Sequence, residues 1–173
     1  FSPDGSKLAW LSMERDGYEA DKNRLFVMDM ATGVKTDLTT EWDYTIEEFA
    51  WNPNGNSIWF IAYHQGTAPI FAIDVNTKAI TVEAEGMVDY TSLSPVDENT
   101  LVTMNHSMLR PNEVFVVTKG NTEAKAITDV NGDIFSQLTM PAVEKRMVPT
   151  TDGKEMLTWV VYPPKFDKNK KYL

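Results

Sequence analysis

The stretch Trp51-Asn52-Pro53-Asn54-Gly55 decides the fold because its pattern repeats along the chain. An apolar residue, a small polar residue and proline also open the chain as Phe1-Ser2-Pro3-Asp4-Gly5 and return, in a degenerate form, as Leu93-Ser94-Pro95-Val96-Asp97. The three prolines are 50 and 42 residues apart. Proline presets φ near about −65° and glycine accepts a positive φ, so the motif predicts a tight turn.

A second motif has the same spacing. Apolar stretches that end in Asp or Thr occur at 25–29, 70–74 and 114–118, and their last residues are 45 and 44 apart. Runs of β-branched and aromatic residues separated by Gly, Pro, Asn and Asp predict short strands, and no segment keeps the 3.6-residue apolar period of a helix. A four-stranded unit of about 40–45 residues repeated in tandem is typical of a β-propeller blade.

The repeat therefore predicts an all-β fold, a partial β-propeller of about three four-stranded blades at residues 1–41, 46–84 and 88–128, within a propeller region 1–140. The first blade should lack its innermost strand. Ile134–Met140 is expected to form a further inner strand after the third blade. Propellers carry about 4–8 blades, so we interpret the chain as an internal segment with further blades upstream.

The pattern changes after the third blade. Val143–Pro149 and Glu155–Tyr162 are strand-like runs that flank Thr150-Thr151-Asp152-Gly153, which predicts a hairpin. A polar exit led by two prolines follows, so residues 141–173 are expected to connect into another domain.

Composition limits the partners of the chain. Among 173 residues, 16 are basic and 25 acidic, and the net charge of −9 disfavours nucleic acid and anionic membrane surfaces. The longest apolar run, Ile58–Tyr63, is far shorter than the roughly 20 residues of a membrane helix. The absence of cysteine excludes disulfides, thiolate metal sites and cysteine nucleophiles.

Together, the blade motifs FSPDG and WNPNG and the segment DGKEMLTWVVYPPKFDKNKKY resemble the prolyl oligopeptidase (S9) family of serine peptidases, in the branch of dipeptidyl and acylaminoacyl peptidases. The resemblance covers the whole chain and implies an N-terminal propeller over a C-terminal α/β-hydrolase domain, whose first hairpin would lie in residues 141–173. It implies that the propeller gates and orients a short peptide substrate for a downstream Ser-His-Asp domain of the same protein. A periplasmic or secreted parent protein is mildly favoured by the same resemblance.

No catalytic residue is expected within these 173 residues, because they contain no Gly-x-Ser-x-Gly nucleophile motif. No cofactor is expected either. Asp129–Asp133 imitates the opening of a calcium loop, but Met140 stands where a bidentate Glu is required, so no metal site is predicted.

Three residues are candidates for substrate binding. Glu47 and Glu48 lie on the approach to the inner strand of the second blade, and the resemblance implies a carboxylate pair that holds the free α-amine of the substrate through charge-assisted hydrogen bonds. Adjacent strand residues point to opposite faces, so the two side chains converge only if the segment is helical or bulged, and otherwise they are solvated acids. Arg110 is a candidate partner for an acidic group at the propeller mouth, with a surface arginine as the alternative.

Other residues have weaker signals. His64 and His106 end apolar runs without metal-ligand spacing, which favours a structural position over a base or a ligand. Trp42 lies in an expected loop, where it would face a ligand or a neighbouring domain. The polar insertion Glu14–Asn23 is either a recognition loop or a solvated hairpin tip.

Two other functions stay open at this point. A TolB-like interaction propeller without enzymatic activity shares the Pro-Asx-Gly blades. A carbohydrate-active propeller requires several carboxylates that converge near the propeller axis.

Overall fold

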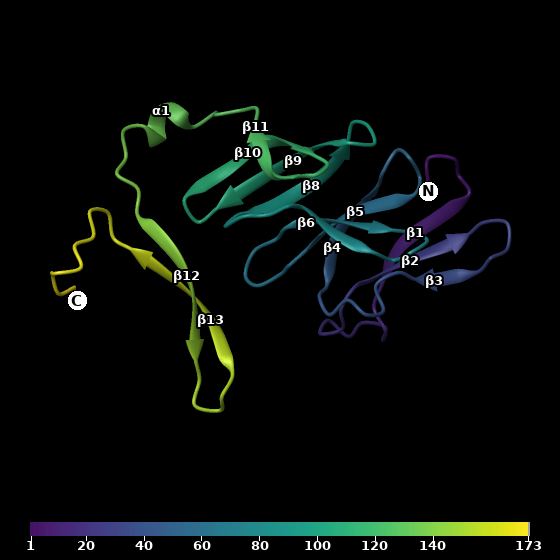
Figure 1. Ribbon diagram of the computed structural model, residues 1–173, viewed down its shortest axis with the longest axis horizontal. Coiled ribbons are helices and arrows are strands. Elements are labelled where there is room, and N and C mark those ends of the chain that lie inside the picture. The colour runs from purple at the N-terminus through teal and green to yellow at the C-terminus, as the bar shows by residue number, and fades with distance from the viewer. Residues whose placement is uncertain (173) are drawn as a thin grey trace.

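The computed structural model describes residues 1–172, which form separate antiparallel sheets that do not close into a ring (Figure 1). The first sheet, blade 1, has the order β1-β2-β3, with β1 (Lys7–Ser12), β2 (Arg24–Asp29) and β3 (Lys35–Asp37). Blade 2 has the order β4-β5-β6-β7, with β4 (Ile46–Trp51), β5 (Ser57–Ala62), β6 (Ile70–Asp74) and β7 (Ile80–Ala84). Blade 3 has β8 (Asp89–Pro95), β9 (Thr100–Ser107), β10 (Arg110–Thr118) and β11 (Asn121–Ala126), again in sequence order.

A two-stranded hairpin follows blade 3. It pairs β12 (Ala142–Pro149) with β13 (Glu155–Tyr162) and lies below blade 3 in Figure 1. The all-β prediction, with three blade-like units of which the first lacks an inner strand, is confirmed.

The strand expected at Ile134–Met140 is wrong. The chain forms one helical turn there, α1 (Gly132–Phe135), and then continues without regular structure to β12. The backbone N–H groups of this segment donate to nearby carbonyls, as Phe135 does to Asn131 at 3.0 Å, rather than to a neighbouring strand. Ile134 and Leu138, the apolar residues that suggested a strand, are exposed. Local turns satisfy the backbone here because the segment has no strand beside it.

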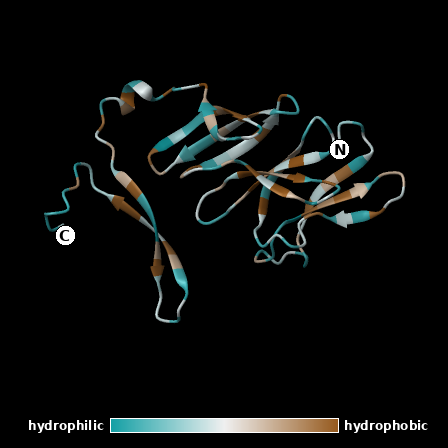
Figure 2. Cartoon of the chain, viewed as in Figure 1, coloured by the Kyte–Doolittle hydropathy of each residue, from teal (hydrophilic) through white to brown (hydrophobic). Residues whose placement is uncertain are grey.

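The core lies between the blades. β5 is buried on both faces: Ile58, Phe60 and Ala62 join the cluster between blades 1 and 2, whereas Trp59 and Ile61 join the cluster between blades 2 and 3. Side chains alternate between the faces of a strand, so a strand covered on both sides is apolar throughout. This explains the long apolar run in the sequence. Figure 2 shows hydrophobic residues on the strands and a largely hydrophilic C-terminal exit.

The two ends of the blades differ. The Pro53 turn joins β4 to β5 at one end of the blades, and the turn after Pro95 joins β8 to β9 in the same way. The strands β4 and β8 therefore begin at the opposite end. We call this opposite end the hairpin end, because the β5–β6 loop contacts the β12–β13 hairpin there. A Cβ atom at Gly66 would lie 3.0 Å from Leu157 Cδ2, and Lys145 Nζ lies 3.5 Å from Gln65 Oε1. Within residues 1–172, no helix is long and apolar enough to cross a membrane.

Candidate functional site

A cavity of about 170 Å³ lies between blades 2 and 3, where the inner strands β4 and β8 begin at the hairpin end. We call it the inter-blade pocket. Its lining combines three carboxylates with aromatic, hydroxyl and imidazole groups: Glu47, Glu48, Ile61, Tyr63, Ala68, Asp89, Tyr90, Thr91 and His106.

A β-bulge brings Glu47 and Glu48 to this pocket. Ile46 pairs with Ala62 and Glu48 with Ile61, which leaves Glu47 as the extra residue of β4. A bulge bends the strand and interrupts its alternation, so two adjacent side chains can reach one cavity. The structure therefore has the bulged geometry that convergence of the two carboxylates requires.

The two glutamates have different surroundings. The Glu48 carboxylate accepts hydrogen bonds from the backbone N–H groups of Leu93, at 2.9 Å, and Ser92, at 3.2 Å. Glu47 is exposed, and no hydrogen bond joins its carboxylate to another residue among those the structure describes. Glu48 thus links blade 2 to blade 3, and Glu47 faces solvent at the pocket.

Sequence reasoning missed Asp89, the third carboxylate of the pocket. It lies six residues before Pro95, as Glu47 lies six residues before Pro53, so the two acids occupy equivalent positions in consecutive repeats. The repeat register contained this signal. Asp89 Oδ2 lies 3.7 Å from Nε2 of His106, its partner across the β8–β9 ladder.

Two other polar groups of the pocket, His106 and Tyr90, have partners within the protein. His106 lies one residue before the end of β9, and its Nδ1 lies 3.2 Å from Asn112 Oδ1, which agrees with a histidine near a strand end. Burial raises the pKa of the Tyr90 phenol, and a hydrogen bond with Asn105 opposes this shift. The phenol is therefore neutral near pH 7 and contributes no charge to the pocket.

Arg110 is not part of the inter-blade pocket. It begins β10, is exposed, and its guanidinium carbon lies 4.7 Å from the centre of the Phe135 ring. It lines a separate open hollow together with Pro111 and Asn112, and His106 borders both spaces. A guanidinium over an aromatic face is held by a cation–π interaction.

The expectation that Trp42 faces a ligand or a neighbouring domain is wrong for the residues described. Its ring packs against Phe71, with centroids 5.0 Å apart, and against Phe60, at 5.8 Å, in the core between blades 1 and 2. The apolar surface of blade 2 is a better environment for indole than the solvent-facing loop that the local sequence suggested.

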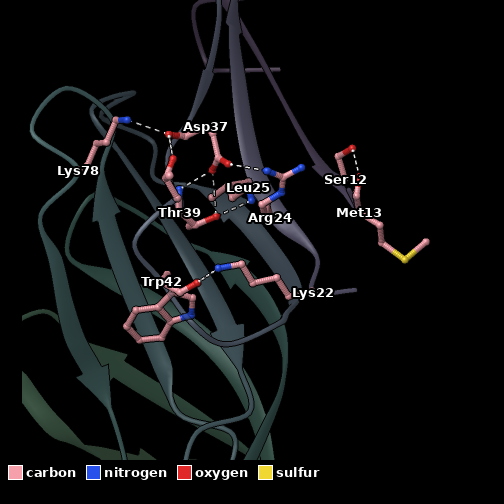
Figure 3. Close-up of polar contacts among 10 residues, drawn as sticks. Ser12, Met13, Lys22, Arg24, Leu25, Asp37, Thr39, Trp42 and Lys78 are labelled. Carbon is pink, nitrogen blue, oxygen red and sulfur yellow. Dashed lines mark hydrogen bonds and ion pairs between the residues drawn. The ribbon is translucent and has the colours of Figure 1, made fainter. Parts of the chain in front are cut away.

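The polar insertion Glu14–Asn23 is ordered by its own contacts. The Arg15 guanidinium donates to both carboxylate oxygens of Asp21, at 2.6 and 3.0 Å, and lies 3.7 Å above the Tyr18 ring. Lys22 Nζ donates to the Trp42 carbonyl, which ties the insertion to the β3–β4 loop (Figure 3).

The same close-up shows the seam between blades 1 and 2. Lys78 of blade 2 donates to the Asp37 carbonyl at 2.8 Å, and the Asp37 carboxylate accepts the Thr39 backbone N–H at 2.9 Å (Figure 3). The Lys78 hydrogen bond crosses from blade 2 to blade 1 and adds to the apolar packing between them.

A second cavity, of about 110 Å³, separates the hairpin from blades 2 and 3. Val143 and Trp159 line it on the hairpin side, and Met87 and Leu109 are among its lining residues on the blade side. Asp89 borders both this cavity and the inter-blade pocket. Across residues 1–172, no three His, Asp or Glu side chains are arranged to hold a metal ion.

Comparison with known proteins agrees with this architecture. The chain is 44% identical over 172 residues to dipeptidyl-peptidase 5 of Porphyromonas gingivalis and 41% identical to that of Porphyromonas endodontalis, in each case over 99% of this chain. It spans about a quarter of the length of these curated relatives. No protein-family model matches the chain.

Solved structures show the same fold at low identity. An acylaminoacyl peptidase in complex with Z-Gly-Gly-Phe-chloromethyl ketone superposes with a TM-score of 0.76 and 18% identity, over 97% of this chain and 25% of that chain. A putative TolB from Agrobacterium tumefaciens superposes with a TM-score of 0.62 and 15% identity, over 94% of this chain and 57% of that chain. Below 25% identity these similarities establish the fold alone.

The relatives and the shared fold point to one class of protein, the S9 serine peptidases, and the predicted resemblance to this family is confirmed. Within that class, the chain is homologous along its whole length to one segment of dipeptidyl-peptidase 5. The identity includes the β12–β13 hairpin as well as the blades, because 99% of the chain is matched.

Proposed function

We propose that the chain is the non-catalytic propeller segment of a serine exopeptidase, which gates the active site and orients a short peptide for a downstream Ser-His-Asp domain. Residues 1–140 belong to the propeller in this proposal, and residues 141–173 begin the α/β-hydrolase domain and connect into it. The 44% identity to dipeptidyl-peptidase 5 supports the substrate class, peptides with a free N-terminus. The downstream domain performs the acyl transfer with a serine nucleophile.

The inter-blade pocket is the observation that carries the orienting role. Glu47 and Asp89 occupy equivalent positions of consecutive sequence repeats and line one cavity at the hairpin end. An α-ammonium group binds carboxylates through charge-assisted hydrogen bonds, which are stronger than neutral ones. Arg110, in the adjoining hollow, is a candidate partner for an acidic group of the peptide.

The amine-binding role predicts a selective loss of affinity. In the full-length protein, Glu47→Gln should raise KM for a dipeptidyl chromogenic substrate with a free amine by roughly 10–100-fold, because a hydrogen bond to a charged group contributes about 1.5–3 kcal/mol. The kcat value should stay within about twofold, because binding is equal in the ground and transition states. Steady-state kinetics with free-amine and N-acylated substrates measure this difference.

Glu85→Gln is the matched control, because Glu85 is an exposed acid in the β7–β8 loop at the same end of the blades. It should leave both kinetic constants unchanged. An unchanged KM for the free-amine substrate in Glu47→Gln and in Asp89→Asn contradicts the proposed role of the pocket.

The non-enzymatic alternative, a TolB-like interaction propeller, shares the fold with this chain. The two functions differ downstream of the hairpin. A Gly-x-Ser-x-Gly motif in the continuing coding sequence supports the peptidase, and further Pro-Asx-Gly blades support the interaction propeller.

A further inference from the structure

We propose that Glu48 is a positioning residue and not a ligand of the substrate amine: its carboxylate holds a bulge in β8 and thereby keeps Asp89 in the inter-blade pocket beside Glu47. This inference rests on the proposed function. It differs from amine binding by the adjacent pair Glu47 and Glu48. Glu47 and Asp89 bind the amine, and Glu48 sets their relative placement.

The first observation is a second bulge, in β8. Thr91 pairs with Met104 and Leu93 with Thr103, so Ser92 is an extra residue in the ladder. Ser92 has φ of 59°, in the left-handed region that favours glycine. A residue other than glycine keeps this conformation only when its surroundings compensate for the strain.

The second observation is that Glu48 compensates for the strain at Ser92. A bulge leaves backbone groups without their ladder partners. The Glu48 carboxylate accepts from both amides at this bulge, Oε1 from Leu93 at 2.9 Å and Oε2 from Ser92 at 3.2 Å. Each oxygen of Glu48 therefore points to the β8 backbone. The same engagement makes Glu48 a poorer acceptor for an incoming ammonium group than the exposed Glu47.

The third step concerns Asp89. It lies three residues before Ser92 on the same strand. The ladder pairs that precede the bulge are Asp89 with His106 and Tyr90 with Asn105, followed by Thr91 with Met104. A shift of one residue in strand register moves every side chain to the opposite face. Loss of the bulge would therefore turn Asp89 out of the pocket or displace the rest of β8 from the core. Glu48, anchored on the bulged strand β4, prevents this shift.

Kinetics of the full-length protein test the division of roles. Glu48→Gln keeps one acceptor oxygen, but its amide NH2 cannot accept from the second backbone N–H, so it should raise KM for the free-amine dipeptidyl substrate less than Glu48→Ala does. Glu48→Ala removes both acceptors and should raise KM as much as Asp89→Asn does, by roughly tenfold or more, with kcat retained. The proposal is overturned if Glu48→Gln raises KM as much as Glu47→Gln, because the charge of Glu48 would then contact the amine.

Hydrogen–deuterium exchange tests the structural part separately. Glu48→Ala should accelerate exchange in peptides that cover β8, and Glu47→Ala, one residue away, should not. Unchanged exchange in β8 for Glu48→Ala overturns the positioning role. If Glu48→Ala does not fold, exchange in β8 is compared between Glu48→Gln and Glu47→Gln at low denaturant. Faster exchange in Glu48→Gln alone supports the positioning role, and equal exchange in the two variants overturns it. If Glu47→Gln leaves KM unchanged while exchange in β8 responds as expected, the amine-binding function fails and the bulge contact stands.

Discussion

Gly66 and Gly120 show how the same backbone conformation can meet different surroundings. Both glycines have a positive φ, of 80° and 81°. A Cβ atom at Gly66 would lie 3.0 Å from Leu157 Cδ2 and 3.1 Å from Trp159 Nε1, whereas nothing lies within 4 Å of the corresponding position at Gly120. Gly66 therefore serves both the turn and the approach of the hairpin to the β5–β6 loop.

This pair gives a prediction at the residue scale. Alanine at either position adds a strain of about 1–2 kcal/mol from the left-handed backbone. Gly66→Ala should lose roughly 1 kcal/mol more than Gly120→Ala, because the added methyl group overpacks the contact with the hairpin. Denaturant unfolding of the full-length protein, followed by tryptophan fluorescence, measures both. Equal losses of unfolding free energy in the two variants would mean that the hairpin does not contact Gly66 closely.

At the scale of elements, Glu113 of β10 organises the loop that leaves blade 3. Its carboxylate accepts from the Thr128 hydroxyl and from the backbone N–H of Val130, at 2.8 Å. The Thr128 hydroxyl foremost, and then the Asn131 and Val130 amides, lower the pKa of Glu113 below its ordinary value. The loop is thus tied to the sheet just before the segment that the sequence suggested as a new strand.

The direction of this shift predicts an acid-sensitive loop. A lowered folded-state pKa adds stability that is complete above the unfolded carboxyl value of about 4.3 and is lost as the pH falls through the folded value. Limited proteolysis within residues 127–137 should therefore be slow near neutral pH and faster in acid. Glu113→Gln should be cleaved faster already at neutral pH. Glu123→Gln, an exposed acid on β11, is the control, and cleavage as fast as in Glu113→Gln would contradict the assignment.

For the whole molecule, the three blades and the hairpin form an open array in which each blade buries one or both faces against its neighbour. The inter-blade pocket and the cavity beside the hairpin exist only because these units are assembled. The chain supplies carboxylates and apolar walls, and the nucleophile motif is absent from its 173 residues.

The chain by itself should therefore have no peptidase activity. The purified 19.6 kDa chain, passed over a gel-filtration column, should show no hydrolysis of a dipeptidyl chromogenic substrate above buffer in any fraction. The full-length protein serves as the positive control. Activity that co-migrates with the chain would require a nucleophile outside the known elbow motif.

Several features of the fold were predictable from local sequence. The turns at Pro3, Pro53 and Pro95 set the repeat, and the hairpin was expected at Val143–Pro149 and begins at Ala142. The strand expected at Ile134–Met140 was wrong, because apolar residues indicate a strand only where a partner edge is available. Trp42 was misplaced for a related reason, since its packing partners lie on strands that follow it in the chain.

The sequence by itself determined the blade repeat, the turns and the apolar strands, because proline, glycine and side-chain alternation act over a few residues. It also contained the equivalence of Glu47 and Asp89, through the repeat. Only the tertiary structure decided that Glu48 binds the backbone of Ser92 and Leu93 and that the carboxylates share one pocket. Those outcomes depend on two bulges and on a side-chain contact between strands of different sheets, whose residues Glu48 and Ser92 are 44 apart in the chain, and no local pattern specifies such contacts.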